Sequence, residues 1–197
     1  MPKVKSLKLQ LKPGCIYRRA DLKELSGDVD RELAQLVHAQ VLVKLWRGVY
    51  ECPKRSRFGL LPPSPWKLVQ AFLRGDDFLL ASPNDFNALG VGTTQLYNCQ
   101  IVFNRRRQGR FELAGQIFEF HKRPDVPRRI TPEFLLVELV NSLPWLAEDR
   151  EMLRANVKSK MSTMCSDRLR SAIKKFSTSQ ARKFFEEKLH PQANHAQ

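Results

Sequence analysis

The sequence lacks the features that mark membrane-spanning and secreted proteins. It contains no run of about 18 apolar residues, the minimum for a membrane-spanning helix, and residues 1–5 carry no apolar stretch of the kind found in a secretory signal. The four cysteines are widely spaced and form no Cys-x-x-Cys pair, and the four histidines are equally scattered. We therefore expect a cytoplasmic protein with reduced thiols, without a disulfide framework and without a metal site.

Known catalytic motifs are missing as well. The sequence contains no Gly-x-Ser-x-Gly, no His-Glu-x-x-His and no paired Asp motif of a nucleotidyltransferase. The segment at residues 90–94 is rich in glycine but lacks the lysine that a phosphate-binding loop requires, so we interpret it as a turn before an extended segment. Asp76 and Asp77 are adjacent, and adjacent side chains of an extended segment point to opposite faces. We expect no enzymatic activity and no cofactor.

Positive charge is the feature present in excess. The chain carries 34 Lys and Arg against 20 Asp and Glu, a net charge of +14. Residues 1–60 hold 13 basic and six acidic side chains, whereas residues 61–145 hold ten and eight. A protein of this charge is attracted to polyanions, because neutralised phosphates release their condensed counterions. The composition indicates nucleic acid or another acidic surface as the partner.

The order of the predicted elements indicates an α+β fold in two parts. We expect an N-terminal winged helix-turn-helix in residues 1–60. A mixed α/β domain with a small antiparallel sheet and C-terminal helices is expected in residues 61–190. The proline-rich segment at residues 61–65 is predicted to be an extended linker, since proline restricts its own φ and the conformation of its predecessor. Residues 191–197 are polar, and we expect a disordered tail there.

The first 52 residues contain the succession of elements found in a winged helix-turn-helix. We predict short helices at residues 6–11 and 19–25, an amphipathic helix at 29–39, and strands at 41–45 and 49–52 joined by a turn at 46–48. In this motif the amphipathic helix enters the major groove of DNA and the hairpin, or wing, lies along the backbone. The N-terminal part is therefore predicted to bind double-stranded DNA.

The amphipathic helix at residues 29–39 has two distinct faces. Asp28 precedes it and is placed to cap its first turn. The apolar stripe consists of Val29, Leu33, Leu36 and Val37. Arg31, Gln35 and His38 share another face, and side chains of this kind hydrogen-bond to base edges. The alternative, that these three side chains only cover a solvated face, stays open at this stage.

Cations outside this helix are expected to supply most of the affinity for phosphate. Asp30 and Glu32 lie in the first turn of the helix, where they would repel phosphate, so the wing and the basic segment after it must compensate. The candidate DNA-binding residues are Arg18, Arg19, Arg31, Gln35, His38, Lys44, Arg47, Lys54, Arg55 and Arg57. Few aromatic side chains are placed to stack on bases, so duplex DNA is favoured over RNA as the ligand.

The remaining residues are predicted to alternate between helices and strands. Helices are expected at residues 66–73, 83–89, 131–140, 147–157, 167–176 and 179–189, and a buried strand at 78–81. Three further strands between residues 101 and 122 are predicted to form a meander, in which residues 104–109 are a hairpin loop. The loop carries Arg105–Arg107, either as a solvated tip or as a second nucleic-acid contact. Thr131 followed by Pro132 is a typical helix start.

Several segments resemble a known family. Residues 13–17, 21–22, 33–37 and 44–54, with an Arg-Gly-Val-Tyr wing that ends in Pro-Lys, resemble the N-terminal domain of AbiEi-type antitoxins of type IV bacterial toxin–antitoxin systems. Residues 82–90, 93–98 and 131–137 resemble the body of a compact AbiEi-like subfamily. The resemblance covers about residues 10–145.

The resemblance implies a DNA-binding antitoxin that represses transcription of its own operon. Its partners would be double-stranded operator DNA and, functionally, a nucleotidyltransferase-like toxin with which it forms no stable complex. A homodimer on DNA is left open. The alternative is a solitary winged-helix regulator whose C-terminal domain dimerises or binds an effector.

Overall fold

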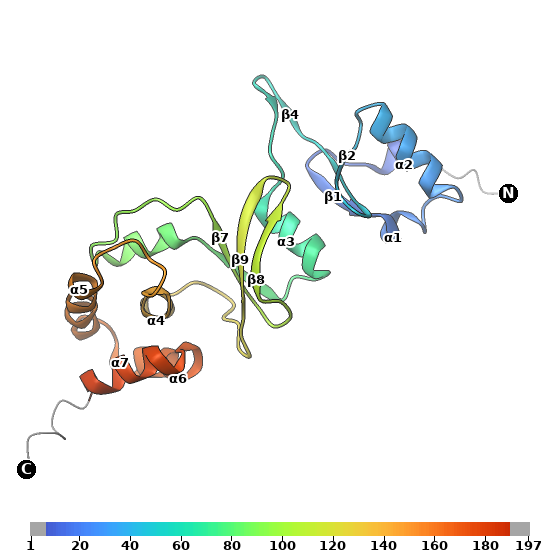
Figure 1. Ribbon diagram of the computed structural model, residues 1–197. Helices are drawn as coiled ribbons and strands as arrows, with labels where there is room; N and C mark the ends of the chain where they lie inside the picture. The colour runs from blue at the N-terminus through green and yellow to red at the C-terminus, as the bar shows by residue number, and fades with distance from the viewer. Residues whose placement is uncertain (1–6, 190–197) are drawn as a thin grey trace, which may run out of the picture. The chain divides into compact units, whose positions relative to one another are not determined.

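The protein is a mixed α+β structure with small antiparallel sheets, as predicted. The computed structural model describes residues 7–189 (Figure 1), so the tail predicted at residues 191–197 lies outside the described residues. The chain divides into two compact units. The N-terminal unit contains residues up to 76 together with residues 109–118, and the C-terminal unit contains residues 77–108 and those from 119 onward. The predicted domain boundary near residue 60 stays a prediction.

A three-stranded antiparallel sheet and two helices open the N-terminal unit. Its elements are η1 (Leu7–Gln10), β1 (Cys15–Arg18), α1 (Arg19–Leu22), α2 (Val29–His38), β2 (Val43–Trp46) and β3 (Val49–Cys52). The strand order is β1-β3-β2. Strand β1 pairs with β3 over its whole length, from Cys15 opposite Cys52 to Arg18 opposite Val49. Two cysteines that are distant in sequence are therefore cross-strand partners.

The helices and strands of this region follow the sequence pattern with local differences. Helix α2 and strand β3 occupy the predicted positions. The helix expected at 19–25 ends at Leu22, and the one expected at 6–11 is a short 3-10 helix. Strand β1 was not predicted, because all four of its side chains are half-buried and its sequence shows no alternation. Pairing with β3 makes it a strand.

The apolar side chains of η1, α1 and α2 form the core of the N-terminal unit. The cluster consists of Leu7, Leu22, Val29, Leu33, Leu36, Leu42 and Cys52. The stripe predicted on α2 is thus confirmed, with Val37 partly buried at its edge. Asp28 is the N-cap residue of α2, but its side chain makes no capping hydrogen bond, contrary to the prediction. Instead, its backbone N–H donates to Oγ of Ser26 at 3.2 Å.

A second hairpin follows β3. Strands β4 (Arg55–Ser56) and β5 (Gly59–Leu60) pair antiparallel and precede helix α3 (Pro65–Leu73). Leu68, Val69 and Leu73 bury one side of α3, whereas Trp66 is exposed. The sequence pattern had predicted a basic segment and a linker here, because two-residue strands are too short to show an alternating pattern.

A four-stranded sheet follows α3, with strand order β6-β7-β9-β8. Its strands are β6 (Phe78–Ala81), β7 (Gln100–Asn104), β8 (Gly109–Leu113) and β9 (Gln116–Lys122). The predicted meander is wrong, since β9 rather than β8 lies next to β7. Phe118 and Phe120 of β9 are fully buried, so this strand takes the inner position. Strand β8 carries the exposed Arg110 and Glu112 and takes the edge.

The residues between β7 and β8 are consequently not the loop of a hairpin. Asn104, which is completely buried, holds the start of this segment with its side chain. Its Oδ1 accepts hydrogen bonds from the backbone N–H groups of Arg106 and Arg107 at 2.9 and 2.6 Å. Its Nδ2 donates to the carbonyl of Arg107 at 3.0 Å. The side chain of one buried residue thus sets the turn that lets β8 pass to the outer edge.

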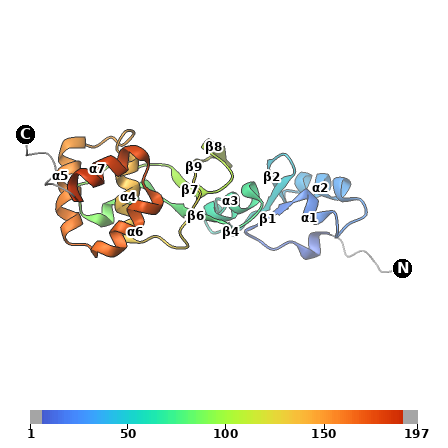
Figure 2. The same ribbon diagram turned by 90° about the horizontal axis from the view of Figure 1, so that it is seen from below.

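Helix α4 (Pro132–Ser142) is the centre of the C-terminal unit. The other helices are η2 (Pro83–Leu89), α5 (Arg150–Ser162), α6 (Ser166–Phe176) and α7 (Ser179–Leu189). Figure 2 shows α4 surrounded by α5, α6 and α7. Every residue from Phe134 to Val140 is buried, which is the pattern of a helix covered on all sides. The predicted cap is confirmed, because Oγ1 of Thr131 accepts from the N–H of Phe134 at 3.2 Å.

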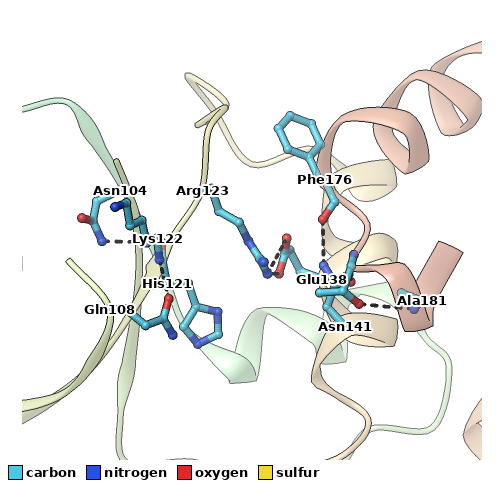
Figure 3. Close-up of polar contacts among 10 residues, drawn as sticks. Asn104, Gln108, His121, Lys122, Arg123, Glu138, Asn141, Phe176 and Ala181 are labelled. Carbon is cyan, nitrogen blue, oxygen red and sulfur yellow. Dashed lines mark hydrogen bonds and ion pairs between the residues drawn. The ribbon is translucent and has the colours of Figure 1, made fainter. Parts of the chain in front are cut away.

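A helix buried on all sides must satisfy its polar side chains internally (Figure 3). Glu138 of α4 is 1% exposed and forms an ion pair with Arg123 at 3.0 Å. Burial raises the pKa of the Glu138 carboxyl, and the nearby Arg123 guanidinium opposes that rise. One turn further, Nδ2 of Asn141 donates to the carbonyl of Phe176 and its Oδ1 accepts from the N–H of Thr178. Glu138 and Asn141 therefore tie α4 to the segments after β9 and α6.

We expect Arg123→Ala to destabilise the protein by about 3 kcal/mol at pH 8, because it leaves a buried carboxylate without its ion-pair partner. The folded-state pKa of Glu138 already lies above its usual value, and the substitution raises it further. At pH 5 a larger share of this carboxyl is protonated than at pH 8, so the loss becomes smaller. Urea unfolding at both pH values measures this, with the exposed Arg128→Ala as control. An equal loss at the two pH values would contradict the assignment.

Candidate nucleic-acid interface

Helix α2 presents a polar face opposite its buried stripe. Arg31, Gln35 and His38 are all exposed on this face, as the helical spacing predicted. Within the described part of the chain, none of these three side chains forms a hydrogen bond or an ion pair. Their polar groups are therefore available to a ligand.

The first acidic residue of α2 is paired with the helix before it. The guanidinium of Arg19 donates from Nε to Oδ1 of Asp30 at 2.6 Å, and from Nη2 to Oδ2. These hydrogen bonds lower the pKa of the Asp30 carboxyl and raise the pKa of Arg19. Both side chains are well exposed, at 42% for Arg19 and 69% for Asp30, so the pair adds little stability. It does place a cation beside the carboxylate that was expected to repel phosphate.

The second acidic residue of α2 binds donors inside the unit. Oε1 of Glu32 accepts from the hydroxyl of Ser26 at 2.6 Å, and Oε2 accepts from the backbone N–H of Leu7 at 3.0 Å. These hydrogen bonds, the one from Ser26 foremost, lower the pKa of the Glu32 carboxyl. Glu32 thereby joins η1, the turn before α2 and α2 itself. Its role is structural, which the sequence pattern did not indicate.

The turn between β2 and β3 lies beside the start of α1. The backbone N–H of Arg19 donates to the carbonyl of Gly48 at 2.8 Å, and Gly48 adopts a left-handed φ of 74° that favours glycine. Arg47 is exposed in this turn, next to the segment that holds Arg18 and Arg19. Lys44 is exposed on β2, opposite Tyr50. The fold thus brings cations from two distant parts of the sequence together at one end of the sheet.

The last three candidate residues lie on the β4–β5 hairpin. Lys54, Arg55 and Arg57 are exposed there, separate from α2 and the β2–β3 turn. Phe58 at the tip of this hairpin is also exposed and was not among the candidates. Phe58 was not counted among the aromatic side chains that could stack on bases, because aromatic residues are usually buried. Only the hairpin pairing shows that Phe58 occupies a turn.

Arg18, like Arg19, is half-buried. It lines a cavity of about 410 Å³ in the N-terminal unit together with Asp21, Lys67 and Arg74. Lys67 donates a hydrogen bond to the carbonyl of Gly14. Arg18 therefore lies on β1 at this cavity and is not part of the exposed face of α2 that carries Arg31.

The described residues 7–189 contain no cluster of three or more His, Cys, Asp or Glu side chains that could hold a metal ion. No helix within the same residues has the length and apolar character needed to cross a membrane.

The sequence matches no protein-family model, and comparison with curated proteins finds no matching relative.

Glu32→Ala is expected to lower the free energy of unfolding by about 1 to 2 kcal/mol, because it removes two hydrogen bonds to a charged acceptor. The pKa of Glu32 is lowered in the folded state, so its stabilisation is present above the usual carboxyl range and is lost as the pH falls through the folded-state pKa. Urea unfolding at pH 7 and pH 3 measures both effects. Glu24→Ala, at an exposed position, serves as control. A Glu32 variant as stable as wild type at pH 7 would exclude this role.

Proposed function

We propose that residues 7–52 form a winged helix-turn-helix that binds double-stranded DNA. The order of elements supports this proposal: η1, β1, α1 and α2 are followed by the β2–β3 hairpin, and β1 completes the sheet. In this motif α2 is the recognition helix and the β2–β3 hairpin is the wing. The observation that carries the proposal is the exposed row of Arg31, Gln35 and His38 on a helix whose acidic side chains are engaged by neighbouring donors.

The two groups of contacts have different tasks in this proposal. Arg31 and Gln35 suit the major-groove edges of guanine and adenine, which they contact with two hydrogen bonds each. Arg47 and Lys44 bind phosphate and carry no sequence information. The net charge of +14 adds a long-range attraction that depends on salt. Arg19 contributes less to phosphate binding than an unpaired arginine would, because its ion pair with Asp30 partly neutralises its charge.

We further propose that the protein is an antitoxin that represses its own type IV toxin–antitoxin operon. The support is the resemblance of residues 10–145 to AbiEi-type antitoxins. The C-terminal unit would then carry the antitoxin function against a nucleotidyltransferase-like toxin, without a stable complex between the two proteins. This function requires a toxin gene beside the gene for this chain.

A second candidate function is a solitary regulator that responds to a small molecule. The C-terminal unit contains an open cavity of about 570 Å³ between the segment before α4 and helix α6, a volume typical of ligand sites. Val126, Phe134 and Phe176 supply apolar walls, and the charged lining is mixed, with Arg168 and Lys175 beside Asp125, Glu133 and Asp167. A largely apolar ligand with polar groups at its edge would fit this lining. The absence of a nucleotidyltransferase-like gene next to this one would favour the second candidate.

A gel-shift titration of the full-length protein tests the first proposal. The probe is the DNA immediately upstream of the gene, at physiological salt, and a random duplex of equal length is the control. We expect at least a tenfold preference for the upstream DNA. Equal binding to both duplexes would remove the proposed repressor function.

Arg47→Ala is expected to weaken binding to all duplexes by a similar factor, because a phosphate contact does not read sequence. The slope of log K against log salt concentration should fall by about one unit. Fluorescence titrations at several salt concentrations measure the slope, with Arg129→Ala in the C-terminal unit as control. An unchanged slope would exclude Arg47 from the contact.

Arg31→Lys is expected to keep the affinity for random duplex but to reduce sequence preference by about 1 to 3 kcal/mol at one base pair. Lysine retains the charge but cannot form the paired hydrogen bonds of the guanidinium. Competition binding against operators altered one base pair at a time measures the preference. If Arg31→Lys retains the full preference, α2 does not read bases through this residue.

A further inference from the structure

The β4–β5 hairpin, residues 54–61, is short but well defined. Arg55 pairs with Leu60 and Ser56 with Gly59, which leaves Arg57 and Phe58 alone in the turn. The hydroxyl of Ser56 donates to the carbonyl of Gly59 at 3.1 Å and accepts from the N–H of Phe58 at 3.2 Å. The backbone N–H of Leu61 closes the base of the hairpin on the carbonyl of Lys54 at 2.8 Å. The position of Phe58 is therefore set by the hairpin before any ligand binds.

The side chain of Phe58 is 85% exposed at this tip. Large aromatic side chains are normally buried, because exposing their surface to water is unfavourable. Its ring contacts the guanidinium of Arg57, which lies 4.6 Å from the ring centroid. A flat apolar ring next to a guanidinium is a combination suited to stacking on a base beside a phosphate.

The charge around Phe58 selects the ligand. Lys54, Arg55 and Arg57 lie on the same hairpin, and the sequence contains no acidic residue between Glu51 and Asp76. A polyanion is the complementary partner of such a segment. Arginine side chains are also attracted into the minor groove of DNA, where the negative potential is strongest when the groove is narrow.

We propose that the β4–β5 hairpin enters the minor groove of duplex DNA and that Phe58 wedges between two adjacent base pairs. Arg55 and Arg57 bind the groove or the flanking phosphates, and the wedge partly unstacks one base step and bends the duplex. Apolar side chains inserted in this manner kink DNA by about 20° to 90°. This inference rests on the proposed function, because it assigns a second contact to the same ligand.

The hairpin is ordered for binding before it meets a ligand. Because the Ser56 hydrogen bonds already order the turn, binding loses little further conformational entropy. Arg57 can leave the ring when a base stacks on it and then bind a phosphate. The contact adds affinity without reading a base by hydrogen bonds, so it complements the recognition proposed for α2.

The test measures bending of a duplex of about 25 base pairs with one central TA step, a step that kinks readily. Donor and acceptor dyes are attached at its two ends, and full-length protein is added to saturation. We expect energy transfer to rise with wild type and with Phe58→Leu, which keeps an apolar wedge. Phe58→Ala should abolish the rise and weaken binding about tenfold, with an unchanged salt slope because no cation is lost. Leu9→Ala, at a position 78% exposed in η1, is the matched control and should behave as wild type.

The outcomes separate this inference from the proposed function. If Phe58→Ala binds and bends the duplex as wild type does, the wedge is overturned while DNA binding stands. If wild type binds no duplex, both proposals fail together. If Phe58→Ala instead loses binding to vesicles containing phosphatidylserine and keeps its binding to duplex, the hairpin is a membrane contact and the wedge is overturned.

Discussion

The burial of one side of α2 is the constraint on which the N-terminal unit depends. Val29, Leu33 and Leu36 pack with Leu7 and Leu22 into a single core. A helix whose apolar stripe is buried has no freedom to rotate about its axis, so its opposite face is determined as well. The same packing brings Glu32 to the donors on η1 and on the turn before α2. Hydrophobic burial thereby decides which polar side chains of α2 face outward and which are used internally.

The distribution of charge in this unit follows from that arrangement. Helix α2 is not itself strongly basic, because Asp30 and Glu32 offset Arg31. The fold compensates locally by placing Arg19 on Asp30. Further exposed cations lie on the β2–β3 hairpin and on the β4–β5 hairpin. In the proposed function, this arrangement assigns base recognition to the helix and phosphate binding to the hairpins.

The C-terminal unit follows a different rule. Helix α4 is covered on every side, so polar residues on it need partners within the protein. Glu138 forms an ion pair with Arg123, and Asn141 forms hydrogen bonds with the backbone of Phe176 and Thr178. Burial and the charge of Arg123 lower the pKa of the neighbouring His121 to about 4, so this histidine is neutral at physiological pH. Its ring packs edge-to-face against Phe103. The interior polar groups of this unit therefore serve its cohesion.

The sequence by itself determined the elements with strong local signals. The 3.6-residue spacing of Val29, Leu33 and Leu36 predicted α2 and its exposed face, and Thr131 followed by Pro132 predicted the start of α4. Both predictions are confirmed, because helix capping and amphipathic spacing depend on residues that lie close together in the sequence. Only the tertiary structure decided the rest. Strand β1 exists because β3 pairs with it, β9 displaces β8 from the inner position because its phenylalanines are buried, and Phe58 is exposed because two very short strands pair around it. These outcomes depend on contacts between residues distant in sequence, for which no local pattern carries a signal.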